Sequence, residues 1–255
     1  MPTCDCVPHP HSLSRLNDVG LTDSGAVDLA STLSTNHTVT KLYLSGNKLG
    51  DSGVKLVSEA LRNPDCKIQI LWLNSVGLTD SGAVDLASAL STKHTVTKLY
   101  LSGNKLGDSG VKLVSEALRN PDCKIQILGL NSVGLTDSGA VDLASALSTK
   151  HTVTKLYLSG NKLGDSGVKL VSEALRNPDC KIQILGLNSV GLTYSGAEDL
   201  ASALRKKPSL TDLRLTHNSL TDRCVPALHR LILTLPRLEW IGLGRMSSVR
   251  AGRRI

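Results

Sequence analysis

The residues of this 255-residue chain that could do chemistry are few, and the densest group lies near its start. Cys4, Cys6, His9 and His11 offer two thiolates and two imidazoles, which together could complete the tetrahedral shell of a zinc ion. The spacing C-x-C-x-x-H-x-H matches no structural zinc pattern, and two prolines stiffen the segment. We therefore interpret residues 1–10 as a disordered lead-in and predict no metal site and no cofactor.

Histidine and cysteine also recur along the chain at an interval of 57 residues. The recurring histidines are His37, His94 and His151, and the recurring cysteines are Cys66, Cys123 and Cys180. No nucleophile is paired with each histidine, so we interpret them as structural or solvated turn residues and not as catalytic bases. Stacked repeats would hold the cysteines about 9–10 Å apart, beyond the roughly 7 Å that a disulfide spans. This predicts buried thiols in a reducing compartment.

A glycine-rich stretch at residues 45–53 raises the question of phosphate binding. It reads Ser-Gly-Asn-Lys-Leu-Gly-Asp-Ser-Gly, and the chain lacks the G-x-x-x-x-G-K-[ST] string of a phosphate loop. Because the stretch recurs once per repeat, its glycines are better explained as turn residues. We predict that the chain is not an enzyme.

The strongest signal in the sequence is self-similarity. The segment from Gly77 to Val133 recurs letter for letter from Gly134 to Val190, with a period of 57 residues. An earlier copy runs from Gly20 to Val76, and a fourth begins at Gly191 and diverges after Leu204. The earlier copy differs from the next only at Thr32, Asn36 and Trp72. Such repetition indicates a solenoid or another repeat architecture.

Each period divides into two related halves of 29 and 28 residues. One half reads V-x-x-L-x-L-x-x-N-x-L from Val39, and the other reads I-x-x-L-x-L-x-x-V-x-L from Ile68. The L-x-L alternation places both leucines on one side of a short strand. The side-chain amide of Asn47 can satisfy backbone groups where the chain turns. A short strand followed by a turn is therefore predicted in each half.

A helix is predicted after each strand. In one half the apolar stripe at i, i+3, i+4 and i+7 consists of Ala83, Leu86, Ala87 and Leu90. Residues 79–82, Thr-Asp-Ser-Gly, supply candidates for the N-cap of that helix. In the other half the inner face consists of Val54, Val57 and Leu61. There we expect Asp51 or Ser52 to cap the helix and residues 63–65, Asn-Pro-Asp, to end it.

No single repeat can bury its apolar faces, so the repeats must stack. Neighbouring strands lie ~4.8 Å apart whereas packed helices need ~8–10 Å, so the stack must curve with its strands inside. The predicted fold is an α/β solenoid in a horseshoe arc, with a parallel sheet on the concave face and helices on the convex face. A ninth strand is predicted at Leu238, Ile241 and Leu243, and the helix pattern does not follow it. We expect the uncapped ends to permit self-association.

The repeat pattern, with its units of 28 and 29 residues, resembles the ribonuclease-inhibitor type of leucine-rich repeat. Leu-Tyr-Leu at 42–44, Leu-Gly-Asp-Ser-Gly-Val at 49–54 and Asn-Pro-Asp-Cys at 63–66 resemble the C-terminal sensor region of NOD-like receptors, especially the pyrin-domain-containing branch. The resemblance covers residues 11–243 and implies a leucine-rich-repeat domain of about eight repeats and a partial ninth. The family often has cysteine where this chain has Val76, Val133 and Val190.

Charge and hydropathy narrow the range of partners. We find no apolar stretch long enough to span a membrane, and the start lacks the apolar centre of a secretion signal, which predicts a cytoplasmic protein. The formal net charge of +7 is uneven, because residues 205–255 hold eleven Lys and Arg against three Asp and Glu. We interpret residues 244–255 as a basic tail. No base-reading motif accompanies it, so we do not expect nucleic-acid binding.

Binding is expected on the concave side of the sheet, where the residues that flank the buried leucines point into the hollow. Tyrosine and tryptophan are the residue types that most often anchor interfaces, and three tyrosines are predicted to form a ladder with Trp72 between the first two. The predicted protein-binding residues are Lys41, Tyr43, Ser45, Trp72, Asn74, Lys98, Tyr100, Ser102, Asn131, Lys155, Tyr157, Ser159, Asn188 and Arg214.

The resemblance implies a non-catalytic interaction module, the ligand-sensing or regulatory part of a NOD-like innate immune receptor. Two alternatives stay open. One is a cytosolic inhibitor that resembles ribonuclease inhibitor, and the other is a consensus or designed scaffold without a natural ligand, since near-identical repeats also arise by duplication or design. An inhibitor of basic ribonucleases should offer an acidic hollow. The predicted concave row carries lysines, which favours the sensor.

Overall fold

The computed structural model of the chain describes residues 12–35, 37–92, 94–149, 151–205, 209–235 and 237–243. The predicted lead-in at 1–10, its Cys and His residues, and the predicted basic tail at 244–255 lie outside the described residues.

Strands and helices alternate along the described chain. The strands are β1 (Ser12–Arg15), β2 (Val39–Tyr43), β3 (Ile70–Trp72), β4 (Lys98–Tyr100), β5 (Ile127–Gly129), β6 (Lys155–Tyr157), β7 (Ile184–Gly186), β8 (Asp212–Arg214) and β9 (Trp240–Gly242). The α-helices are α1 (Asp23–Thr35), α2 (Gly50–Leu61), α3 (Asp80–Leu90), α4 (Gly107–Leu118), α5 (Asp137–Leu147), α6 (Gly164–Ala174), α7 (Tyr194–Leu204) and α8 (Val225–Thr234). A short 3₁₀ turn, η1 (Asp222–Cys224), precedes α8.

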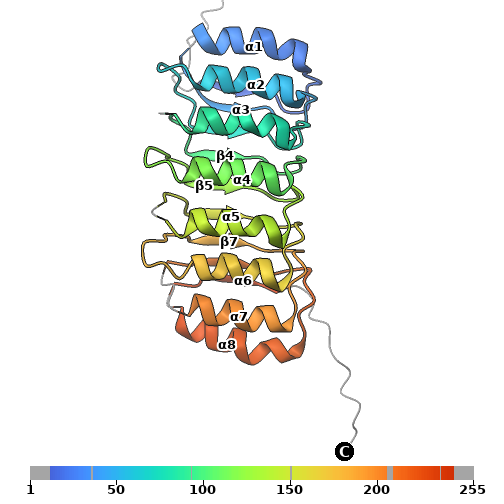
Figure 1. Cartoon of the computed structure of the whole chain (residues 1–255), viewed down its shortest axis with the longest axis vertical. Coiled ribbons are helices and arrows are strands. Elements are labelled where there is room, and N and C mark those ends of the chain that lie inside the picture. The colour runs from blue at the N-terminus through green and yellow to red at the C-terminus, as the bar shows by residue number, and fades with distance from the viewer. Residues whose placement is uncertain are drawn as a thin grey trace, which may run out of the picture.

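The strands form one parallel sheet in chain order, from β1 to β9. Helices stack in the same order in a second layer, from α1 at one end to α8 at the other (Figure 1). Each helix contacts the next one along the chain. The molecule is therefore a leucine-rich-repeat solenoid, as the sequence predicts, with its helices on the convex side and the other face of the sheet open on the concave side.

The core lies between the two layers and is filled by the residues that the L-x-L pattern predicts. The leucines at both pattern positions, Leu71 and Leu99 within β3 and β4 and Leu73 and Leu101 directly after them, are fully buried. The predicted helix stripes are buried as well, from Val54, Val57 and Leu61 in α2 to Ala83, Leu86, Ala87 and Leu90 in α3. Aliphatic layers of this kind need no phenylalanine, which the chain lacks.

An asparagine closes the turn after every second strand, and it is buried in the first three cases and half-buried in the last. The Nδ2 of Asn104 donates to the carbonyls of Leu73 and Leu101 at 2.7 and 2.8 Å, and its Oδ1 accepts from the amides of Val76 and Leu78, each at 3.1 Å. The same four bonds are made by Asn47, Asn161 and Asn218. The predicted role of Asn47 is thus confirmed, and each bond set joins two successive repeats.

The two kinds of helix begin differently. Helix α3 begins after Thr79, whose side chain accepts a hydrogen bond from the Ser81 amide, so a predicted N-cap segment is confirmed. Helix α2 begins at Gly50 after Leu49, and no side chain caps it, so the prediction that Asp51 or Ser52 caps this helix is wrong.

The carboxylate of Asp51 serves the next repeat. It accepts from the Thr79 amide at 2.8 Å and from the Thr79 hydroxyl at 2.6 Å. An acidic side chain in the first turn of α2 thereby holds the start of α3. The equivalent residues Asp108 and Asp165 bind Thr136 and Thr193 in the same way.

Candidate protein-binding face

Three parallel rows of side chains run across the open face of the sheet, one for each outward position of the strands. The register aligns the first row as Lys41, Ile70, Lys98, Ile127, Lys155, Ile184, Asp212 and Trp240, which we call the lysine row. Two residues further along each strand it aligns Tyr43, Trp72, Tyr100, Gly129, Tyr157, Gly186 and Arg214, which we call the ring row.

Aromatic rings are in direct contact at one end of the ring row. The ring centroid of Trp72 lies 4.9 Å from that of Tyr43 and 4.9 Å from that of Tyr100. Both contacts are edge-to-face, with interplanar angles of 70° and 62°. Such pairs stabilise aromatic clusters beyond the area that they bury. The three half-buried rings therefore form one continuous platform.

Glycine takes the place of Trp72 in the two later copies. A Cβ atom on Gly129 would lie 2.9 Å from Cδ1 of Tyr100, and one on Gly186 would lie 3.2 Å from Cδ1 of Tyr157. The tyrosine before each glycine therefore leans over the glycine strand, which a side chain at that position would prevent. Burial raises the pKa of the Tyr100 hydroxyl, and the nearby phenols of Tyr157 and Tyr43 raise it further.

An arginine continues the ring row after the last tyrosine. The guanidinium carbon of Arg214 lies 5.7 Å from the Tyr157 ring centroid and 5.6 Å from that of Trp240. Its Nη2 lies 2.8 Å from Oδ2 of Asp212, and hydrogen bonding to this carboxylate raises the pKa of the Arg214 guanidinium. Stacking between two rings and pairing with a carboxylate fix this side chain.

Asp212 and Trp240 are parts of the face that sequence reasoning missed. Trp240 is 48% exposed, and it shares the lysine row with Asp212. The signal was the strand pattern itself, because Asp212 lies two positions before Arg214 of the ring row, and Trp240 occupies the same position in the next strand.

The third row carries the serines and asparagines that were predicted as binding residues. The Ser45 hydroxyl oxygen accepts from the Asn74 amide at 3.1 Å, and Oδ1 of Asn74 accepts from the Ser102 amide at 2.9 Å. The pattern continues along the later strands through Asn131, Ser159, Asn188 and Thr216. Their acceptor atoms already join neighbouring repeats, so this row has less hydrogen-bonding capacity for a partner than the first two.

Charge on the open face is concentrated in the lysine row. Lys41 is exposed, and Lys98 and Lys155 are half-buried. Among the described residues, the two ion pairs of the chain are Lys169 with Asp199 and Arg214 with Asp212, so these three lysines have no acidic partner. A positive row beside an aromatic row suits a partner that offers carboxylates.

The recurring cysteines and histidines line shallow clefts together, Cys66 with His94 in one and Cys123 with His151 in another. Cys66, Cys123 and Cys180 are buried and make no disulfide, and burial raises the pKa of the thiols of Cys66 and Cys123. Across the part of the chain that the structure describes, no group of three or more His, Cys, Asp and Glu residues could hold a metal ion.

His94 should make the fold sensitive to acid. The Val96 amide donates to its Nδ1 at 3.1 Å, and burial, followed by the charge of Lys124, lowers the pKa of its imidazole below the usual 6.5. The unfolded chain then binds more protons than the folded one, so stability should fall as the pH drops through about 6.5. Chemical denaturation at pH 7.5 and 5.5 measures the loss.

A His94→Asn variant isolates this residue from the other titrating groups, because Asn can still accept from the Val96 amide. Its loss of stability between the two pH values should be smaller than that of the wild-type chain. Equal losses in the two proteins would contradict the prediction.

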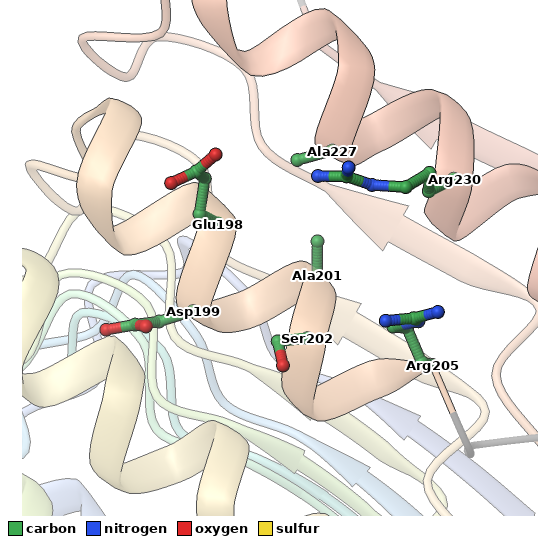
Figure 2. A pocket seen from close by; sticks show the side chains of 7 residues that line it. All are labelled: Glu198, Asp199, Ala201, Ser202, Arg205, Ala227 and Arg230. Atoms are coloured by element: carbon green, nitrogen blue, oxygen red, sulfur yellow. The ribbon is translucent and has the colours of Figure 1, made fainter.

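A cleft of about 530 Å³ opens on the helical side between α7 and α8. Arg205 and Arg230 lie toward one end, and Glu198 and Asp199 line the other (Figure 2). Because its charges are of both signs and Asp199 already pairs with Lys169 at 3.9 Å, the cleft favours no class of ligand.

No helix within the described ranges combines the length and apolar character that crossing a membrane requires.

Comparison with known proteins supports the repeat assignment. The family model described as Leucine Rich repeat matches residues 35–58, 92–115, 149–172 and 206–223. The chain is 43% identical over 222 residues to the NACHT, LRR and PYD domains-containing protein 3 of Homo sapiens, an alignment that covers 86% of this chain and 21% of that protein. It is 39% identical over 228 residues to protein 12 of the same series in Homo sapiens, covering 88% of this chain and 22% of that protein.

A second kind of relative is the ribonuclease inhibitor of Mus musculus, which is 37% identical over 218 residues. That alignment covers 86% of this chain and 48% of the inhibitor. The chain thus spans about a fifth of the length of the NACHT-containing relatives and about half of the inhibitor.

Proposed function

The chain is an array of leucine-rich repeats of the ribonuclease-inhibitor type, and from this premise we propose that it binds a protein through its concave face. The observation that supports this proposal best is the platform of Tyr43, Trp72 and Tyr100 beside lysines that have no acidic partner among the described residues. Large rings with few rotatable bonds offer contact area at low entropic cost, and unpaired lysines favour an acidic or hydrogen-bond-accepting surface.

Similarity to the NACHT, LRR and PYD domains-containing proteins supports a finer proposal, that the chain is the ligand-sensing or regulatory part of a NOD-like receptor. Buried thiols at Cys66 and Cys123 fit a reducing cytoplasm. Leucine-rich-repeat domains are typically non-catalytic, and we extend this to the present chain.

Replacing Tyr100 with alanine should weaken binding of a protein partner by about 2 kcal/mol, or roughly 30-fold, because an anchor ring of the platform is lost. The partner is first isolated by affinity purification from reducing cytosolic extract, and its Kd is then measured with purified proteins. A rise in salt should weaken the same complex, since the lysine row is partly exposed to solvent.

The matched control is Glu116→Ala, which changes an exposed residue of α4 on the helical side. A larger loss of affinity for Glu116→Ala than for Tyr100→Ala would overturn the concave assignment, and so would affinity that does not depend on salt.

The non-catalytic proposal predicts that the purified chain does not hydrolyse ATP or GTP, because no phosphate loop with its metal-binding carboxylate is present in the sequence. Steady-state phosphate release measures this. Saturable turnover that a single substitution abolishes would refute the prediction.

The similarity to ribonuclease inhibitor supports a second candidate, an inhibitor that binds a basic ribonuclease. The lysines of the concave face disfavour it, since like charges would meet across the interface. Inhibition of a basic ribonuclease by the purified chain would decide for this candidate.

A further inference from the structure

The spaces between neighbouring rings of the ring row differ along the sheet. Trp72 fills the first interval, between Tyr43 and Tyr100, and touches both rings. Arg214 stacks on Tyr157 beyond Gly186 and thereby contributes a cation to the last interval. The middle interval, between Tyr100 and Tyr157, lies over Gly129, which brings no side chain to it.

The chain itself shows which group fits such an interval. The copies that contain the first and middle intervals have the same sequence apart from three positions, and one of these three is Trp72, which corresponds to Gly129. The same backbone therefore accepts an indole between two tyrosines, with a ring centroid 4.9 Å from each. Tyr100 leans over the buried Gly129, so its ring must turn aside when a ligand ring enters the interval.

Charges beside the middle interval limit the kind of ligand. Lys98 and Lys155 lie two residues before Tyr100 and Tyr157 on the same face, and Ile127 lies between the two lysines. Neither lysine makes an ion pair with any described residue. Two unpaired cations on either side of an apolar residue favour carboxylates that flank an apolar or aromatic group.

We propose that the interval over Gly129 is a slot for an aromatic side chain of a partner polypeptide, with acidic residues adjacent to that side chain that pair with Lys98 and Lys155. The proposal rests on the proposed protein-binding function and names the chemistry of the partner. A single-stranded nucleic acid also offers flat rings and negative charge, but the alternation of lysine with isoleucine suits the alternating side chains of an extended peptide better than an evenly charged backbone.

A blocked peptide, Glu-Glu-Trp-Glu-Glu, is the probe, and NMR titration of the isotopically labelled whole chain gives the Kd and the number of sites. Gly129→Trp places the chain's own indole in the slot and should weaken binding at least roughly tenfold. Trp72→Gly empties the equivalent interval between Tyr43 and Tyr100, beside Lys41 and Lys98, and should add a second site. Both substitutions exchange residues that the copies already carry, so both variants should fold, and circular dichroism checks this.

Two further peptides test the chemistry of the slot. Glu-Glu-Ala-Glu-Glu should bind at least roughly tenfold more weakly, and Lys-Lys-Trp-Lys-Lys should not bind. Unchanged affinity in Gly129→Trp, a single site in Trp72→Gly, or tighter binding of a short oligothymidine than of the acidic peptide would each overturn the proposal.

Binding of the protein partner isolated for the Tyr100→Ala experiment distinguishes a failure of the slot proposal from a failure of the proposed function. If Tyr100→Ala weakens that complex and Gly129→Trp does not, the concave face binds the partner and the slot proposal fails. If neither variant affects the complex, the proposed function fails at this face.

Discussion

Replacing Asn104 with alanine should lower the free energy of unfolding by about 4 kcal/mol, one of the largest effects of any single substitution in this chain. The side chain is 3% exposed and makes four hydrogen bonds, all of them to backbone groups of two successive repeats. Alanine leaves two amides and two carbonyls without partners where water has little access, and each such group costs roughly 1–3 kcal/mol. Chemical denaturation followed by circular dichroism measures the change.

Asn74→Ala is the matched control. This residue is half-buried, and the bond that its side chain makes is the one that Oδ1 accepts from the Ser102 amide at 2.9 Å. Its loss should cost about 1 kcal/mol. Equal losses of unfolding free energy in the two variants would show that the four buried hydrogen bonds do not determine how much Asn104 stabilises the fold.

The layered architecture could be predicted because it depends on interactions that repeat with the sequence. The two leucines of L-x-L lie on the same face of a strand whatever lies beside them, and the stripe of α3 follows from helical geometry alone. Asn47 was predictable for the same reason, since an amide after a strand has backbone groups within its reach.

Contacts between repeats were harder to predict because they depend on the direction of a side chain across the stack. Asp51 lies in the first turn of α2, where an acidic residue often acts on its own helix, yet its carboxylate binds Thr79 of the next repeat. The pairing of Arg214 with Asp212 and its stacking between Tyr157 and Trp240 likewise depend on rotamers that spacing does not determine.

The Asp108 carboxylate that links two repeats also explains a glycine inside a helix. Gly139 lies in the first turn of α5, where alanine would normally stabilise the helix by about 0.5–1 kcal/mol. A Cβ atom at this position would lie 2.3 Å from Oδ1 of Asp108. That oxygen cannot easily move, because the same carboxylate accepts from the Thr136 amide at 2.8 Å and from the Thr136 hydroxyl at 2.6 Å.

Gly139→Ala should therefore destabilise the wild-type chain by about 2 kcal/mol, the typical cost of forcing a methyl group into an occupied space. Asp108→Ala should cost a similar amount, about 2 kcal/mol, through the loss of two charge-assisted hydrogen bonds. In the Asp108→Ala background the space is empty, so Gly139→Ala should become neutral or stabilising by about 0.5 kcal/mol.

Denaturation of the four proteins of this double-mutant cycle gives the coupling energy between the two substitutions. The equivalent pair Asp51 and Gly82 should reproduce it, since the Cβ of Gly82 would also lie 2.3 Å from the carboxylate. Additive effects of the two substitutions would mean that the carboxylate does not impose glycine at this position.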